Sequence, residues 1–488
     1  MSSSDTHARH WIGGEWVDSE THTDSIDPAT YDVIGTYADG GEAEAQACTA
    51  AAKRAFTETD WSTNRQLRAQ ALNEMADRFE AATDELVEIL SLENGKVKDE
   101  ARFEVTMAPS KLRFYAALAL AEGGRAVQVA AGKYTTVYRE PMGVAGVIAP
   151  WNSPIILFIR SLAPALAAGT TVAGKLPGQT AQTNAAMYRV FASVESLPAG
   201  VLNVFHESGP DGSKALVASP DVPTISFTGS TATGAAILEA GAPMIKRFGL
   251  ELGGKTPHVV AADADLDGAL PVIVKSLTTF AGQFCMTGSR LLVERPVYDE
   301  VRDRLGEMLA AVKAGPAADP ESDMGPLIDR PNVDRVDEIV EKAIAEGATV
   351  VTRGGPITEG PLSKGAFYRP TLLEVADPKM DIVQEETFGP VLTMQAYDSE
   401  DEAIALANDS IYGLAAAVWS TDVDRPLRLA RRIDAGTVWI NNWAVIYDES
   451  AEGGYKQSGL GRLNGVAAME DFVEYKTVIQ ELSVVERA

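Results

Sequence analysis

Cys285 and Glu251 are the two side chains of this sequence best suited to covalent chemistry. Cys285 lies among glycine and polar residues in the segment 280–289, which predicts a turn with free backbone N–H groups. A thiolate is a nucleophile, but an unperturbed thiol, with a pKa of about 8.5, needs help to ionise near neutral pH. Glu251 stands between two leucines and before a glycine pair, where a partly apolar pocket would raise its pKa toward that of a general base.

Each of these residues also has a purely structural explanation. A free cysteine is commonly a small buried side chain, and Cys48, inside an alanine-rich segment, fits that description. Glu251 could equally face solvent from one side of a strand. The residues alone leave both interpretations open.

Two further segments could hold a ligand at the ends of predicted strands. Residues 227–234 follow a strand and open a helix, where backbone amides and the helix dipole can hold a phosphate. Their GxTxxG arrangement differs from the GxGxxG fingerprint of dinucleotide sites. Asn152 follows the apolar segment 144–149 and could either offer its amide N–H₂ to a ligand or, like Ser153, cap the next helix.

The elements that would position these residues alternate between short apolar strands and helices. Such alternation implies a mostly parallel, doubly wound sheet. A second run of this kind extends from about 256 to 441, and amphipathic helices are predicted at 42–57 and 63–91. The strands of the first run are 144–149, 171–174, 201–204 and 224–227, its helices are 154–168, 180–196, 211–219 and 231–241, and helices of the second run are 296–314 and 333–346.

Two segments have the period-two alternation of exposed strands. Residues 133–147 alternate around a turn at 141–143, which predicts a hairpin, and residues 472–482 predict one strand near the end of the chain. Strands so far apart in sequence could pair and extend a sheet across a subunit boundary.

Composition excludes several classes of partner. The 488 residues include 42 Lys plus Arg and 69 Asp plus Glu, for a net charge of −27, whereas nucleic acids and anionic membranes are bound mainly through Lys and Arg. Two cysteines cannot form a disulfide framework. The N-terminus lacks the apolar core of a secretory signal, and Arg160 and Pro164 interrupt the best candidate for a membrane span, 155–174. We therefore expect a soluble, cytoplasmic protein that binds no nucleic acid, membrane or metal.

Six motifs occur in the order typical of the aldehyde dehydrogenase superfamily, which this chain resembles from Trp11-Ile12-Gly13-Gly14 to its final strand. The separation of Glu251 and Cys285 along the chain also resembles that of the family. The motifs are Pro150-Trp151-Asn152, Phe227-Thr228-Gly229-Ser230, Glu251-Leu252-Gly253-Gly254-Lys255, Gly282-Gln283-Phe284-Cys285, Glu386-Thr387-Phe388-Gly389-Pro390 and Gly454-Tyr455-Lys456-Gln457-Ser458-Gly459.

The resemblance implies an α/β fold with two doubly wound α/β domains and a small β arm for oligomerisation. The arm implies a homodimer or a homotetramer. By this resemblance the cofactor-binding domain comprises residues 1–121 and 142–252, the catalytic domain 253–467, and the arm 122–141 and 468–488.

The resemblance also implies NAD(P)-dependent oxidation of an aldehyde to its carboxylic acid. Cys285 would attack the aldehyde carbon, and Asn152 with the Cys285 N–H would stabilise the oxyanion. Glu251 would activate the water that hydrolyses the resulting thioester. NAD or NADP would be held by residues that match the family's cofactor contacts, namely Trp151, Lys175, Gly178, Gly229, Ser230, Leu252, Glu386 and Phe388.

The sequence departs from the family pattern at positions that concern the cofactor and the proton exit. Gly178 stands where many members have a glutamate that binds the adenosine ribose. Without that carboxylate a 2′-phosphate meets no like charge and could pair with Lys175, so we expect use of both NAD and NADP. Ala451-Glu452 replaces a common Pro-Phe, and Leu463 replaces a glutamate that could relay protons.

Arg160 concerns the substrate. Some semialdehyde dehydrogenases of the family place an arginine at this position, where it can pair with a substrate carboxylate. The alternative is a surface arginine, and Thr279 occupies the place of a second such arginine. The substrate therefore stays open between semialdehydes and other aldehydes.

Other activities are also consistent with a reactive Cys285. A CoA-acylating semialdehyde dehydrogenase would transfer the acyl group to CoA, but such enzymes lack the general base that Glu251 offers. A thiol hydrolase or esterase would not need the cofactor motifs. A non-catalytic relative would not need an intact nucleophile, base and oxyanion residue.

Overall fold

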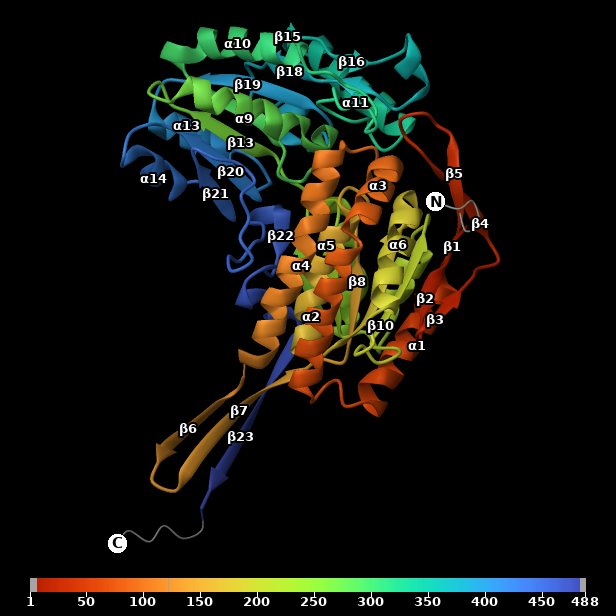
Figure 1. Ribbon diagram of the computed structural model, residues 1–488. Helices are drawn as coiled ribbons and strands as arrows, with labels where there is room; N and C mark the ends of the chain where they lie inside the picture. Colours follow the sequence, from red (N-terminus) through yellow and green to blue (C-terminus); the bar gives the residue numbers. More distant parts are fainter. Residues whose placement is uncertain (1–6, 122, 483–488) are drawn as a thin grey trace.

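The computed structural model describes residues 7–121 and 123–482, which form two stacked α/β sheet units and a projecting β arm (Figure 1). This is the α/β architecture expected from the alternation of strands and helices. No helix in the described part of the chain is long and apolar enough to cross a membrane. Residues 1–6, 122 and 483–488, which belong to the predicted domains and arm, lie outside the described residues.

The first unit is an eight-stranded sheet whose five central strands are parallel. Its central strands are almost wholly buried, because helices cover both faces and enclose two apolar cores. In order across the sheet, the strands are β22 (Gly459–Leu460), β12 (Arg247–Glu251), β11 (Thr224–Thr228), β8 (Val144–Ile148), β9 (Thr171–Pro177), β10 (Leu202–Glu207), β2 (His10–Ile12) and β3 (Glu15–Val17).

The helices of this unit agree closely with the sequence pattern. Two of them, α5 (Pro154–Ala168) and α8 (Thr231–Gly241), have the predicted limits. The predicted helix 63–91 is instead two helices, because the backbone leaves helical geometry at Ala82, with ψ near 2°. The others are α1 (Glu42–Glu58), α2 (Arg65–Ala81), α3 (Thr83–Asn94), α4 (Lys98–Ala121), α6 (Ala181–Ala192) and α7 (Asp211–Ala218).

The second unit is a seven-stranded sheet, parallel except for one edge strand. It follows the first along the chain, since β12 and β13 lie in different sheets. Across the sheet its strands are β15 (Thr349–Thr352), β18 (Thr371–Glu374), β19 (Val391–Tyr397), β14 (Gly288–Glu294), β13 (Thr256–Val260), β20 (Ala415–Trp419) and β21 (Thr437–Ile440), and its helices are α9 (Leu266–Thr278), α10 (Tyr298–Ala310), α11 (Arg330–Ala345), α12 (Asp381–Gln384), α13 (Glu400–Asn408) and α14 (Arg425–Ala430).

One strand from the later part of the chain pairs with the first sheet. The short strand β22, which belongs to the predicted catalytic segment 253–467, pairs with β12 of the first sheet. The predicted boundary after Leu252 falls in the loop between the two sheets, while the exact domain limits stay a prediction.

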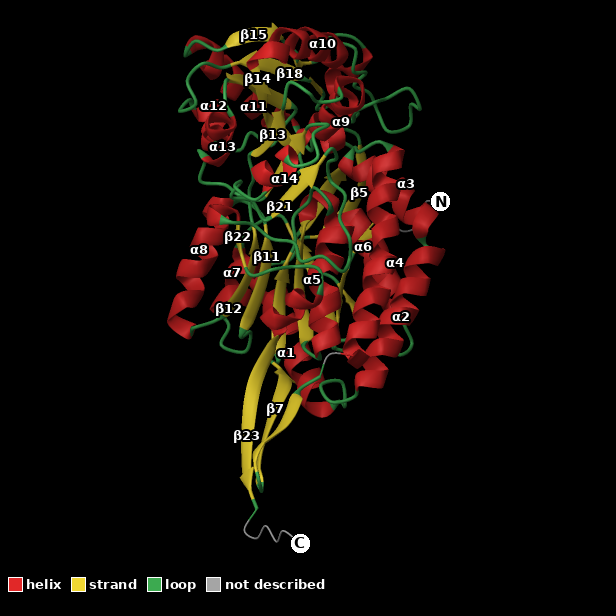
Figure 2. Ribbon diagram, turned by 90° about the vertical axis from the view of Figure 1, so that its left-hand side faces the viewer, coloured by secondary structure: helices red, strands yellow, loops and turns green. Residues whose placement is uncertain are grey.

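The arm is a three-stranded antiparallel sheet that extends away from both units (Figure 2). Its central strand β7 (Lys133–Pro141) pairs with β6 (Arg125–Ala130) and, over nine residues, with β23 (Val473–Glu481). The two distant strands predicted from their alternation therefore pair with each other within one chain.

The predicted hairpin over residues 133–147 is wrong. Residues 144–148 form β8 in the eight-stranded sheet, and the chain passes from the arm into that sheet at Gly143, which has a φ of 116°. All five residues of β8 are buried, whereas the arm strands are largely exposed. Residues 144–148 are apolar and are more stable in the core than in an exposed hairpin, so they pair with β9 and β11. β7 pairs with β6 and β23 instead.

A small sheet lies beside β2 and β3 at the N-terminal edge (Figure 1). Its order is β1 (His7–Ala8), β5 (Val33–Ala38) and β4 (His22–Ile26). β5 is parallel to β1 and antiparallel to β4.

Candidate active site

Cys285 lies in a turn just before β14, on a loop whose backbone is strained. Three successive residues before it have left-handed φ angles: Phe280 at 54°, Ala281 at 55° and Gly282 at 72°. Such angles are uncommon for residues other than glycine and persist where the surroundings enforce them. At Gly282 a Cβ would come within 2.4 Å of the Gly389 carbonyl carbon, so the loop is packed tightly against the segment after α12.

Asn152 joins this loop from the end of β8. Its Nδ2 donates a hydrogen bond of 2.9 Å to the backbone oxygen of Gln283, two residues before Cys285. Neither Asn152 nor Ser153 caps α5 with its side chain, because the Glu104 carboxylate accepts the N–H of Ile155 at 2.9 Å. The amide of Asn152 is thereby directed to the cysteine loop.

Glu251 ends β12, is almost wholly buried, and is near enough to Cys285 for the two charges to interact. Burial raises its pKa to about 8; the positive charge of Arg160 opposes this rise and the charge of Glu452 adds to it. The direction is the one expected from the flanking leucines. Cys285 shares the same surroundings: burial raises the pKa of its thiol, Arg160 lowers it, and the charges of Glu452, Glu386 and Glu251 raise it further.

Arg160 is a buried residue, which corrects the expectation of a surface arginine. Its Nη1 lies 2.9 Å from Oε1 of Glu452, and both side chains are about 5% exposed. Its Nη2 donates to Oγ1 of Thr228 at 3.3 Å. The guanidinium already has a carboxylate partner within the chain, so a substrate carboxylate would have to compete with Glu452 for it.

A chain of buried polar contacts continues from Glu452 toward the surface. Asn464 donates to Oε2 of Glu452 at 2.7 Å and accepts from Nζ of Lys111 at 2.6 Å. Lys111 in turn lies 2.8 Å from Asp448, which is 18% exposed. Glu452, from which this network extends, stands where many family members have Pro-Phe-Gly-Gly. The unexpected acid at this position was the one sign of the network in the sequence.

Glu386 and Phe388 face the loop between β12 and β13. Glu386 accepts the N–H of Gly254 at 3.1 Å, and burial raises its pKa to about 7. The Phe388 ring meets the Trp151 ring edge to face, with centroids 5.6 Å apart. A small hollow lies here, lined by Gly254, Thr287, Glu386, Phe388 and residues beside them.

Gly229, Ser230 and Leu252 lie together at the ends of β11 and β12. Ser230 is the N-cap of α8 and accepts the N–H of Thr233. The N–H of Gly229 donates to the Glu251 carbonyl at 3.0 Å. Leu252 packs on Gly234, where a Cβ would meet its Cδ2 at 2.6 Å. The exposed first turn of α8 is thus held directly beside Glu251.

Lys175 lies near the end of β9 and Gly178 directly follows that strand, and both have partners that the sequence did not indicate. Nζ of Lys175 lies 3.9 Å from Oε1 of Glu207, a buried carboxylate opposite Pro177 in the strand register. A Cβ at Gly178 would come within 2.5 Å of the Tyr37 hydroxyl. Strand pairing alone brings Glu207 here, and no local motif indicated it.

Comparisons with known proteins identify one family. The sequence profile of the aldehyde dehydrogenase family matches residues 16–478. Betaine aldehyde dehydrogenase of Bacillus subtilis (strain 168) is 38% identical over 472 residues, which cover 96% of each chain. 2-Hydroxymuconic semialdehyde dehydrogenase of Pseudomonas sp. (strain CF600) is 37% identical, over 97% of this chain and 99% of that protein.

Solved structures show the same similarity. The crystal structure of betaine aldehyde dehydrogenase from Staphylococcus aureus in complex with NAD⁺ superposes with a TM-score of 0.95 at 33% identity, covering 98% of this chain and 96% of that one. An aldehyde dehydrogenase from Bacillus cereus superposes with a TM-score of 0.94 at 34% identity, over 97% of this chain and 96% of the other.

Proposed function

The chain belongs to the aldehyde dehydrogenase family, and on that premise we propose that it oxidises an aldehyde to its carboxylic acid with NAD(P). The observation that carries the proposal is that two residues at the ends of β8 and β12 both act on the loop that holds Cys285. The Asn152 amide is hydrogen-bonded to the loop of Cys285, and the Glu251 carboxyl is close enough to influence the pKa of the thiol.

Cys285 and Asn152 would perform the first half of the reaction. The Cys285 sulfur attacks the aldehyde carbon and forms a thiohemiacetal, whose oxygen carries the negative charge. One N–H of the Asn152 amide is held by Gln283, which leaves the second N–H and the Cys285 backbone N–H to stabilise that oxygen. Bound NAD(P) supplies the hydride acceptor that makes this an oxidation.

Glu251 would perform the second half. The thioester on Cys285 is hydrolysed by water, whose proton passes to the Glu251 carboxylate as the new C–O bond forms and the thiolate leaves. A carboxyl with a pKa of about 8 accepts this proton more readily than an ordinary glutamate.

The residues at the strand ends fit a nicotinamide dinucleotide. The Glu386 carboxylate can accept hydrogen bonds from a ribose, and the Phe388 and Trp151 rings provide flat apolar faces. The exposed N-terminus of α8 at Ser230 suits a pyrophosphate. We propose Trp151, Lys175, Gly178, Gly229, Ser230, Leu252, Glu386 and Phe388 as the cofactor contacts, as the resemblance implies.

Glu207 favours NAD over NADP as the cofactor. The expectation of dual use assumed that Lys175 is free to pair with a 2′-phosphate. Glu207 lies 3.9 Å from its ammonium and already balances its charge, and Asp39 contributes a further negative charge to its surroundings. We propose that these carboxylates repel a 2′-phosphate, so that kcat/KM for NAD exceeds that for NADP by more than about tenfold.

Glu207→Gln is the variant that tests this proposal. It removes the charge and keeps one acceptor oxygen, whereas the N–H groups of Gly212 and Ser213 now bond to different oxygens of the carboxylate. We expect the preference for NAD to fall by about tenfold or more, as measured by kcat/KM with both cofactors. Gly178→Glu is a poorer test, because its Cβ would collide with Tyr37. A wild type that prefers NADP, or an unchanged ratio in the variant, would contradict the assignment.

One assay separates the proposed reaction from its alternatives. Purified protein is mixed with cofactor and an aldehyde, with and without CoA, while the absorbance of reduced nicotinamide is followed. Turnover without CoA supports the hydrolytic dehydrogenase. Turnover only with CoA indicates the CoA-acylating type, and cleavage of esters without cofactor reduction indicates a hydrolase. A panel of aldehydes that includes betaine aldehyde and semialdehydes then identifies the substrate class.

The arm supports assembly of several copies. Large apolar side chains lie exposed along it, including Tyr134, Tyr138, Tyr475 and Ile479, and exposed strand edges readily pair with another chain. We propose a homodimer or homotetramer in which the arm contacts a second copy, in the cytoplasm. Sedimentation velocity of the full chain and of the Ile479→Lys variant tests the contact, and equal sedimentation of both would contradict it.

A further inference from the structure

Two histidines and an aspartate meet at the N-terminal edge, on elements other than those that hold Cys285. We propose that His7, Asp18 and His22 form a binding site for a divalent transition-metal ion such as Zn²⁺. The proposal is independent of the proposed function, and the sequence analysis expected no metal. His7 lies on β1, Asp18 directly follows β3, and His22 begins β4.

The three potential ligand atoms have the spacing that one ion requires. Oδ1 of Asp18 lies 3.0 Å from Nε2 of His7 and 3.0 Å from Nε2 of His22. All three atoms lie within 4.8 Å of one another. Two ligands of a tetrahedral Zn²⁺ are roughly 3.3 Å apart, so small movements of exposed side chains would place an ion between them.

Neighbouring groups orient two of the three ligands. Oγ1 of Thr36 lies 2.9 Å from Nδ1 of His7. When this hydroxyl accepts the Nδ1 proton, Nε2 carries a lone pair that faces the carboxylate, and a cation between them satisfies both atoms. The N–H of Ser19 donates to Oδ1 of Asp18 at 2.9 Å and holds that carboxylate in place.

The distribution of histidines makes this cluster distinctive. The sequence has five histidines, and the other three, His10, His206 and His258, are fully buried. The side chains of His7 and His22 are 25% and 50% exposed, and their rings lie 4.5 Å apart. Imidazole with carboxylate is a donor set that suits Zn²⁺, Ni²⁺ and Cu²⁺, and solvent can fill the remaining coordination positions.

A bound ion would link separate elements. His7 and His22 lie on the two outer strands of the small sheet, and Asp18 follows the edge strand of the eight-stranded sheet. β1 is only two residues long, so few backbone hydrogen bonds hold it. The ion would therefore attach the first described residues of the chain to the main sheet.

Calorimetric titration of the purified full chain with ZnCl₂ tests the site. We expect one Zn²⁺ per chain in the wild type, a loss of affinity of about 100-fold or more in His22→Ala, and a loss of about tenfold in Thr36→Val, because orienting groups typically contribute 10–100-fold. Asp18→Asn should also weaken binding. Asp24→Asn, an exposed aspartate on β4, makes the same change of charge in the same sheet and should bind as the wild type does.

Cys285 is present in every variant, so any ion bound by its thiol is common to all titrations. Aldehyde oxidation should be unchanged in His22→Ala, which reports that the variant is folded. Equal affinity and stoichiometry in the wild type and His22→Ala would overturn the proposal, as would an equal loss in Asp24→Asn and Asp18→Asn. A wild type that binds Zn²⁺ more weakly than about 1 mM would overturn it as well, because that corresponds to only about 4 kcal/mol of binding free energy.

Discussion

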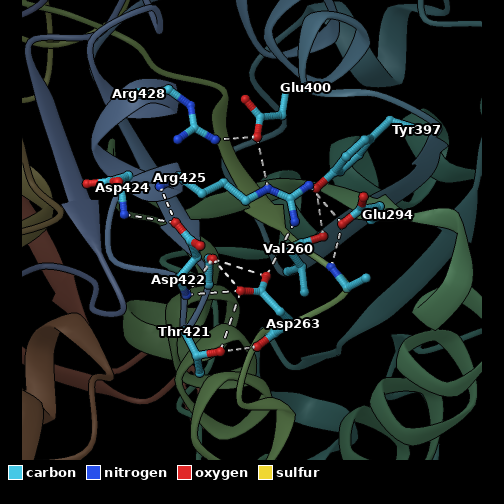
Figure 3. A network of polar contacts seen from close by, with 12 residues as sticks. Val260, Asp263, Glu294, Tyr397, Glu400, Thr421, Asp422, Asp424, Arg425 and Arg428 are labelled. Carbon is cyan, nitrogen blue, oxygen red and sulfur yellow. Dashed lines mark hydrogen bonds and ion pairs between the residues drawn. The ribbon is translucent and has the colours of Figure 1, made fainter.

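Two arginines, Arg160 and Arg425, each occupy the centre of a polar network, and the two networks differ in burial and in the number of partners. The side chain of Arg425 is 17% exposed and lies 3.4 Å from Asp263, 2.9 Å from Glu294 and 3.3 Å from Glu400 (Figure 3). Arg160 is 5% exposed and has one carboxylate partner, Glu452 at 2.9 Å.

The two networks differ in what the loss of one arginine would do to its carboxylate partners. Around Arg425, Glu400 also pairs with Arg428, and Asp263 also accepts from Ser420, so each carboxylate keeps a partner if the arginine is removed. Around Arg160, loss of the guanidinium would leave Glu452 with the neutral amide of Asn464 as a partner, and it would leave Glu452 and Glu251 buried close together without the positive charge between them. The first network joins α14 to neighbouring loops, whereas the second sets the electrostatics of the candidate active site.

The network around Arg160 lies beside Cys285, where we propose that the reaction takes place. Cys285→Ser tests this location and should cause the largest loss of activity. Aldehyde oxidation should be lost while cofactor binding persists, because an alcohol is far less ionised than a thiol near pH 7. Steady-state rates measure aldehyde oxidation, and titration with the cofactor measures its binding. Cys48→Ser, at the other cysteine, should have little effect. A serine variant with a tenth of wild-type turnover would remove Cys285 from the mechanism.

Arg160→Leu breaks the buried network itself. Removing one partner of a buried ion pair typically costs about 3–5 kcal/mol of unfolding free energy, and activity should fall for every aldehyde because Glu452 is left uncompensated. Denaturant unfolding measures the first effect. The double variant Arg160→Met/Glu452→Leu should recover most of the lost stability. A rise in KM confined to an ω-semialdehyde, absent for its uncharged analogue, would instead restore the idea of a substrate carboxylate at Arg160.

Glu251→Gln separates the two half-reactions within that network. Acylation needs the thiol and deacylation needs an activated water, so a burst of reduced cofactor should survive while steady-state turnover falls by about 100-fold. Stopped-flow absorbance records the burst, and mass spectrometry should find acylated Cys285. Unchanged steady-state turnover would exclude Glu251 as the base.

The pH dependence of the deacylation rate provides a second test of Glu251 as the base. With a pKa of about 8, the Glu251 carboxyl is protonated and inactive as a base at lower pH. The deacylation rate of the wild type should therefore rise by about tenfold per pH unit up to about 8 and then level off. This limb should be absent in Glu251→Gln.

Arg425→Gln provides the smallest expected effect and completes the comparison. Ion pairs at partly exposed sites contribute about 0–1 kcal/mol, and the remaining contacts of Glu400 and Asp263 compensate for the loss. Unfolding free energy should therefore change by about 1 kcal/mol or less, with kcat and KM unchanged. A loss of activity comparable to that of Arg160→Leu would show that the two networks are not distinct in function.

The candidate site was predictable from sequence as far as its motifs are local. Glu251, Asn152 and Cys285 each stand at the end of a strand or in a turn that the residue pattern indicates. The first residues of α5 and α8 follow from Pro154 at the first position of one helix and Ser230 as the N-cap of the other. The direction of the Glu251 pKa also followed from its apolar neighbours.

Which distant residues meet depends on the long-range packing of the chain and not on local sequence. The pairing of Arg160 with Glu452 spans 292 positions, and β7 pairs with β23 across more than half of the chain. The approach of Lys175 to Glu207 depends on the register of β9 and β10, and that of His7 to His22 on their positions in the small sheet. Local pattern determines which segments are strands or helices and which side is apolar. It does not determine strand partners or buried charge pairs, because these depend on long-range register and on how far burial removes each group from water.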